Sequence, residues 1–153
     1  MLITRIAIRL CLGIVLGTLS VAAQAGLGEP KEHVEQDRVA LQAAAVTVTH
    51  ASAYDRHELR AANGVTVHEF SDRQGTVFAV SFVGPAMPDL KVLLGSHFAE
   101  YATKAHASPS THKVYTHSSS TLQLSLVKLP RGFTGTAVVP GGIPVGVDPR
   151  DLH

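Results

Sequence analysis

The hydrophobic pattern of the chain is strongest in one segment, Thr76–Val83. In an extended strand, Phe78, Val80 and Phe82 point to one side of this segment. The other side carries Val77, Ala79, Ser81 and Val83. Two nearly apolar faces are typical of a strand that lies inside a sheet and is covered on both sides. We therefore expect this strand to form the centre of the fold.

A helix is predicted directly after this strand. Gly84-Pro85 ends the strand, Pro88 suits the first helical position, and Asp89 in the first turn interacts favourably with the helix dipole. The apolar residues of the core-facing stripe recur in steps of three and four: Leu90, Leu93, Leu94, Phe98 and Tyr101. Gly95 in mid-helix costs about 1 kcal/mol relative to alanine, so we expect a neighbouring segment to pack close to its backbone.

The remaining elements follow from weaker patterns. A thin apolar stripe of Val34, Leu41 and Ala45 predicts a first helix over residues 30–45. Asn63-Gly64 between two β-prone runs indicates a hairpin. The predicted strands besides the central one are 54–59, 65–70, 122–129 and 133–139. The polar stretch 102–120 is expected to be a loop.

This order, α-β-β-β-α-β-β, predicts an α+β domain. We expect a curled, mainly antiparallel sheet of about five strands packed on one main helix, with a partly open β-barrel as the alternative. The domain is expected to span residues 26–139. Residues 140–153 contain too much proline and glycine for regular structure, so a C-terminal tail extended over the surface is predicted.

The N-terminal 25 residues have the pattern of a secretory signal peptide. Arg5 and Arg9 form a basic segment, an apolar run follows, and Ala23-Gln24-Ala25 is a small-x-small cleavage pattern, which makes Gly26 the first mature residue. An uncleaved signal anchor is the alternative, although the run is shorter than the roughly 20 residues of a membrane span. The protein is therefore expected to be exported, to the periplasm or the medium, with no membrane span after cleavage.

Composition narrows the function classes further. The one cysteine, Cys11, lies within the signal segment, so the mature chain can form no disulfide and has no cysteine nucleophile. The 13 basic and 12 acidic residues give a net charge of +1, and loss of Arg5 and Arg9 changes this to −1. Because no dense basic run interleaved with aromatic residues occurs, we expect no nucleic-acid partner.

The predicted hairpin carries the best candidate site, formed by His57, Glu58, His68 and Glu69. A two- or four-residue turn would place the two glutamates opposite each other, and these like charges repel unless a metal ion, a shared proton or Arg56 relieves them. A three-residue turn would pair each histidine with a glutamate and would require no ligand. The four residues are therefore weak candidates for a metal or general acid–base site, and a solvated sheet face is the favoured interpretation.

Other catalytic motifs are missing from the sequence. It contains no G-x-S-x-G and no glycine-rich phosphate loop, so we expect no cofactor. The histidines at positions 97, 106, 112 and 117 are spaced too loosely to define a metal site. Asp89 could act as a general base in a pocket, but an acid in the first turn of a helix more often caps it.

The segment GTVFAVSFVGPAMPDLKVLLGSHFAEY, residues 75–101, resembles the signature of an exported bacterial family, domain of unknown function 2844. The resemblance extends over most of the mature chain and includes a hairpin with Tyr54 and His57-Glu58-Leu59. It departs from the family pattern at His68-Glu69-Phe70 and at Ser81-Phe82. The signature positions used below are Gly75, Phe78, Gly84, Pro85, Pro88, Asp89, Leu93, Gly95, Phe98 and Tyr101. The resemblance implies a fold and export, and it implies no activity.

These patterns favour an exported, non-enzymatic module that binds a protein partner or a component of the cell envelope. A small metal- or carboxylate-dependent enzyme built on the hairpin face is the alternative, and a structural envelope protein is a third interpretation.

Overall fold

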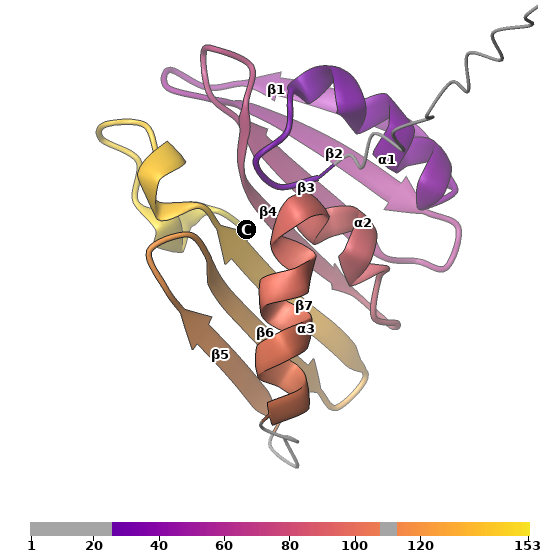
Figure 1. Ribbon diagram of the computed structural model, residues 1–153. Coiled ribbons are helices and arrows are strands. Elements are labelled where there is room, and N and C mark those ends of the chain that lie inside the picture. Colours follow the sequence, from indigo (N-terminus) through magenta and orange to yellow (C-terminus); the bar gives the residue numbers. More distant parts are fainter. Residues whose placement is uncertain (1–25, 108–112) are drawn as a thin grey trace, which may run out of the picture.

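The computed structural model describes residues 26–107 and 113–153, which build one seven-stranded antiparallel sheet (Figure 1). The strand order is β1-β2-β3-β4-β7-β6-β5. The strands are β1 (Ala43–His50), β2 (Asp55–Ala61), β3 (Thr66–Ser71), β4 (Val77–Gly84), β5 (Val114–Ser118), β6 (Gln123–Leu129) and β7 (Gly132–Val138). The predicted signal peptide, Cys11 and His112 lie outside the described residues.

The prediction of a central strand is confirmed, since β4 is the fourth of the seven strands and Val77 to Phe82 are all buried. One detail of its pattern is wrong. A bulge between β3 and β4 pairs Ser71 with Val77 and Phe70 with Ala79, which leaves Phe78 as an extra residue. Phe78 therefore lies on the same face as Ala79, whereas Val77 packs with Val80 on the opposite face.

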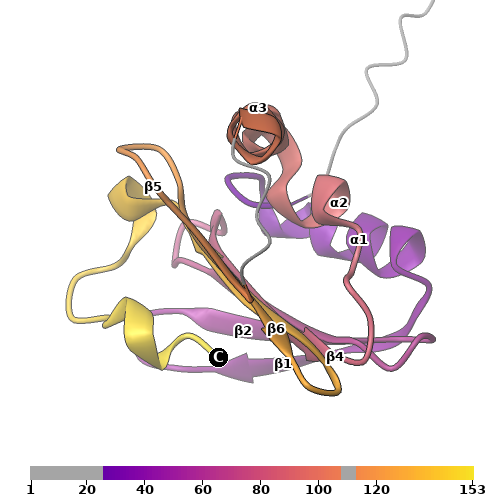
Figure 2. The same cartoon turned by 90° about the horizontal axis from the view of Figure 1, so that it is seen from below.

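The helices cover one face of the sheet, which we call the helix face (Figure 2). They are α1 (Val34–Ala40), α2 (Leu90–Leu94) and α3 (Phe98–Ala107). The α+β class and the antiparallel sheet are thus confirmed, but the sheet has seven strands where about five were predicted, and it is not closed into a barrel. The predicted main helix is interrupted at Gly95, whose φ of +49° suits glycine. A Cβ atom on Gly26 would lie 2.9 Å from the Gly95 nitrogen, so a backbone does pack closely there.

Two other element assignments from the sequence are wrong. The first helix ends at Ala40, where the predicted helix continued to residue 45, and Gln42 with a φ of +53° turns the chain into β1. The alanines favour a helix locally, but Val46 to His50 pair with β2 and the gain from this pairing decides the structure. In the stretch 102–120, helix α3 continues to Ala107, and Val114–Ser118 forms the edge strand β5.

The C-terminal segment covers part of the other face, which we call the tail face (Figure 2). It contains two 3₁₀ turns, Pro140–Gly142 and Pro149–Asp151, where an extended course was predicted. Leu152 is only 1% exposed. It packs in a second core with Phe70, Phe78, Ala79 and Val138. The tail thus belongs to the folded domain.

Candidate functional site

The β2–β3 hairpin adopts the three-residue turn, one of the two arrangements left open by the sequence. The Ala61 amide donates to the Val65 carbonyl at 2.8 Å, and Gly64 has a φ of +81°. In the resulting register His57 lies opposite Glu69, and Glu58 lies opposite His68. The two glutamates are therefore not paired with each other.

The four hairpin candidates do not form one site, because neighbouring residues of a strand point to opposite faces. His57 and Glu69 lie on the helix face and are 8% and 1% exposed, respectively. Glu58 and His68 lie on the tail face. Within residues 26–107 and 113–153, no group of three or more His, Cys, Asp or Glu side chains could hold a metal ion. The favoured interpretation of these four residues as a solvated sheet face is therefore wrong for His57 and Glu69, which are buried under the helices.

On the tail face, Glu58 is already provided with partners. One of its carboxylate oxygens accepts a hydrogen bond from Arg60 Nε at 2.8 Å, and the other lies 3.4 Å from His68 Nε2. The bond from Arg60 is the main cause that lowers the pKa of Glu58. Burial is the main cause that lowers the pKa of His68, and the nearby Glu58 opposes this effect. These groups form a small charged cluster that needs no metal.

The most unusual chemistry lies on the helix face, where Asp37 of α1 meets Glu69 of β3. Each residue is 1% exposed. Among the described residues, none of the four carboxyl oxygens has a hydrogen-bond partner. Burial raises the pKa of Asp37 to about 7. Burial, with the nearby Asp37 charge, raises the pKa of Glu69 well above its usual value. Two such carboxyls share a proton because both cannot ionise in a dry site.

This carboxyl pair lies between a helix and the sheet, and two ionised carboxylates would repel each other there, so the packing requires that at least one carboxyl is protonated. Asp37 was not among the residues predicted from the sequence. A signal was present, since Asp37 lies three residues after Val34 and four before Leu41, on the apolar stripe of the helix. An acid at a stripe position is either buried or distorts the packing. Here it is buried.

A histidine–serine pair lies on the same face of the hairpin. His57 Nε2 lies 3.1 Å from Ser71 Oγ. Burial is the main cause that lowers the pKa of His57, which favours the neutral ring. A serine beside a histidine is the arrangement of an activated nucleophile, but Ser71 is 0% exposed. A substrate could not reach its hydroxyl in this fold, so the pair serves to satisfy two buried polar groups.

Asp89 is the N-cap of α2, and its carboxylate accepts a hydrogen bond from the Lys91 backbone amide at 2.8 Å. The capping interpretation is therefore confirmed.

His117 of β5 lies 2.7 Å from Glu100, whose pKa is lowered to about 2, chiefly by this bond and by Ser119. His106 Nδ1 lies 2.6 Å from the Ala102 carbonyl oxygen. His106 and His117 are thus engaged separately.

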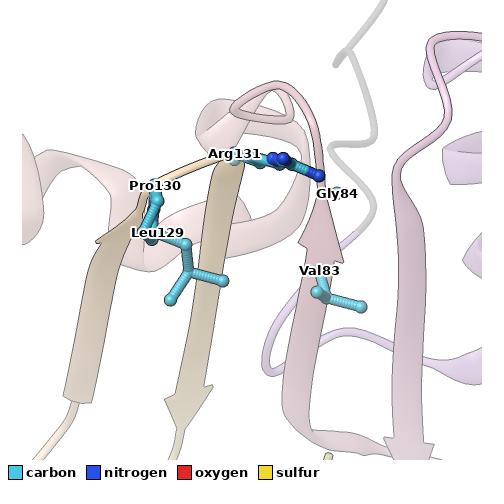
Figure 3. A pocket seen from close by; sticks show the side chains of 6 residues that line it. Val83, Gly84, Leu129, Pro130 and Arg131 are labelled. Carbon is cyan, nitrogen blue, oxygen red and sulfur yellow. The ribbon is translucent and has the colours of Figure 1, made fainter.

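An apolar depression of about 490 Å³ lies at the end of the sheet where β4 ends and β6 turns into β7 (Figure 3). It is lined by Val83, Gly84, Leu129, Pro130, Arg131 and Gly132. The turn lies so close to the end of β4 that a Cβ atom on Gly132 would collide with the Gly84 carbonyl oxygen. In Figure 3 the side chains of Val83 and Leu129 point to the same side of the sheet, and Arg131 reaches toward Gly84.

Residues 23–152 match the family described as protein of unknown function (DUF2844). The chain belongs to this family. The comparisons with curated proteins and with solved structures gave no match.

In this DUF2844 chain, the signature positions build the interior and its turns. Phe78 lies in the second core, and Leu93 is 1% exposed in the first. Phe98 packs on Tyr101 with ring centroids 5.9 Å apart, and Tyr101 meets Tyr115 of β5 edge-on at 5.6 Å. No helix in the described parts of the chain is long and apolar enough to cross a membrane.

Proposed function

We propose that the protein is an exported, non-enzymatic module, periplasmic or secreted, that binds a component of the cell envelope. The signal-peptide pattern of residues 1–25 supports export. The non-enzymatic part of the proposal rests on the burial and the pairing of the reactive side chains. Ser71, Glu69 and Asp37 are at most 1% exposed, and Glu58 is held by Arg60 and His68. Function then rests on the outer surface, where an apolar depression adjoins Arg131, which forms no ion pair with the residues that the structure describes.

Cell fractionation tests this proposal. We expect the chain to be recovered outside the cytoplasm, beginning at Gly26 by mass spectrometry, and to fractionate in part with the envelope. Detection should use an antibody, because Leu152 is buried and a C-terminal tag would disturb the second core. Recovery in the cytoplasm with Met1 retained would contradict export.

A metal- or carboxylate-dependent enzyme on the hairpin remains testable in the same material. Elemental analysis of untagged protein should show no stoichiometric metal. Metal at one equivalent that is lost in Glu58→Ala or Glu69→Ala would overturn the non-enzymatic proposal.

A further inference from the structure

Exposed apolar side chains gather at one end of the sheet. Val83, Met87, Val114 and Leu129 are 50%, 38%, 50% and 40% exposed. Three of them lie on the tail face. A row of cross-strand pairs runs across β4, β7, β6 and β5: Val83 pairs with Thr134, Thr134 with Val127, and Val127 with Val114. Leu129 follows Val127 by two residues along β6. Met87 is in the loop that leaves β4 beside the β6–β7 turn (Figure 1).

The same end is positively charged. Residues 113–139 contain Lys113, Lys128 and Arg131 and no aspartate or glutamate. Lys113 and Lys128 are neighbours, since the Lys128 amide donates to the Lys113 carbonyl at 2.7 Å. All three cations are exposed, and none forms an ion pair within the part of the chain that the structure describes.

The nearby acids leave this charge uncompensated. Glu58 is bound to Arg60 at 2.8 Å. Asp89, two residues after Met87, caps α2 and is followed by the exposed Lys91. We call Val83, Met87, Val114, Leu129, Lys113, Lys128 and Arg131 the docking end.

We propose that the docking end binds the surface of an anionic phospholipid bilayer. The apolar side chains enter the boundary between headgroups and acyl chains, and the three cations contact lipid phosphates. This combination of exposed apolar residues with basic residues around them is the chemistry by which proteins adhere to anionic lipid surfaces without crossing them. The inference rests on the proposed function, because it names the envelope component as the lipid itself.

A single soluble partner fits these observations less well. The apolar residues are spread over a row of strands and a separate loop, and the depression beside Arg131 is open rather than enclosed (Figure 3). A small ligand is usually surrounded by its pocket. A broad surface with a few protruding apolar groups requires a broad partner, and an oppositely charged bilayer is such a partner.

Vesicle sedimentation tests the proposal. The protein used is the full chain after the host has exported and processed it. Vesicles of phosphatidylcholine with 40% phosphatidylglycerol are compared with pure phosphatidylcholine, at low and high sodium chloride. We expect binding to the anionic vesicles only, weakened by salt because surface charges are screened. Each cation removed should lower the partition coefficient about fivefold.

The matched variants remove equal charge at different places. Lys113→Gln, Lys128→Gln and Arg131→Gln together should reduce anionic-vesicle binding on the order of 100-fold. Lys31→Gln, Lys104→Gln and Arg150→Gln together remove three exposed cations elsewhere and should leave binding within about threefold, since surface potential decays within a Debye length. Leu129→Ser should weaken binding and Val39→Ser, at a 62% exposed site on α1, should not.

Three outcomes would overturn the proposal. They are equal binding to both vesicle types, equal loss in both triple variants, and saturable binding of monomeric decanoate without any vesicle binding. The last would assign the depression to a soluble anionic amphiphile. Envelope fractionation that persists while vesicle binding fails would reject the lipid and leave the proposed envelope function in place.

Discussion

The buried carboxyl pair makes a sharp prediction about the pH dependence of stability. In the unfolded chain Asp37 titrates near pH 3.9, and in the folded protein its pKa is raised to about 7. Between these values the folded state binds the proton that the unfolded state has lost. The stabilisation that the proton provides is complete below pH 4 and is lost as the pH rises through 7, so the free energy of unfolding falls with rising pH.

The magnitude follows from the shift of Asp37 alone. A rise from about 4 to about 7 corresponds to about 4 kcal/mol. Glu69, whose pKa is raised in the same direction, adds to this loss. His57 and His68 have the opposite effect, because their lowered pKa values make the folded state more stable as the pH rises through 6.5. The wild-type profile alone therefore cannot isolate the pair.

A double variant, Asp37→Asn with Glu69→Gln, isolates the contribution of the pair. The two amides do not titrate, so its stability relative to wild type should improve by at least about 3 kcal/mol between pH 4.5 and pH 8. The control is Gln36→Ala, an exposed change on the same helix at a residue that does not titrate, for which the difference from wild type should stay constant over this range. Urea unfolding followed by circular dichroism at each pH gives the free energies. Parallel profiles for wild type and double variant would refute the shared-proton interpretation.

Two further predictions concern packing. In urea unfolding, Leu152→Ala should lower the free energy of unfolding by about 2–4 kcal/mol. Val145→Ala, in the same segment but at a fully exposed side chain, should change it by less than about 0.5 kcal/mol. Equal effects of the two substitutions would show that the tail is not docked. Gly132→Ala should lower the melting temperature by several degrees, because its Cβ would collide with the Gly84 backbone. Gly141→Ala should not lower it, because no atom lies within 4 Å of a Cβ added there. An unchanged melting temperature in Gly132→Ala would contradict the close approach of the turn to β4.

The sequence predicts the parts of the fold that are set by local chemistry. Val77–Phe82 has apolar residues on both faces, and it is the central strand because only an interior position buries both. Asn63-Gly64 marks the hairpin, since Gly64 adopts a positive φ that glycine accepts without strain. Asp89 caps its helix as its position after Pro88 suggests.

The remaining parts depend on contacts between distant segments. Ala43–His50 is alanine-rich and locally compatible with a helix, and only pairing with β2 makes it a strand. The extra residue at Phe78 cannot be read from alternation because a bulge changes which side chains share a face. Likewise, the partner of Asp37 is 32 positions away in the sequence, so its burial was not predictable from the helix pattern alone.

The central claim is that the buried ionisable residues of the helix face, Asp37, His57 and Glu69, form a sealed interior and not a reaction centre. A carboxyl ¹³C NMR titration of Glu69 tests it most directly. The account predicts that Glu69 titrates well above the usual pKa of a glutamate and that its signal is unaffected by added zinc or manganese ions. Titration near pH 4.5, together with a shift or broadening on addition of metal, would show an accessible carboxylate and would contradict the account.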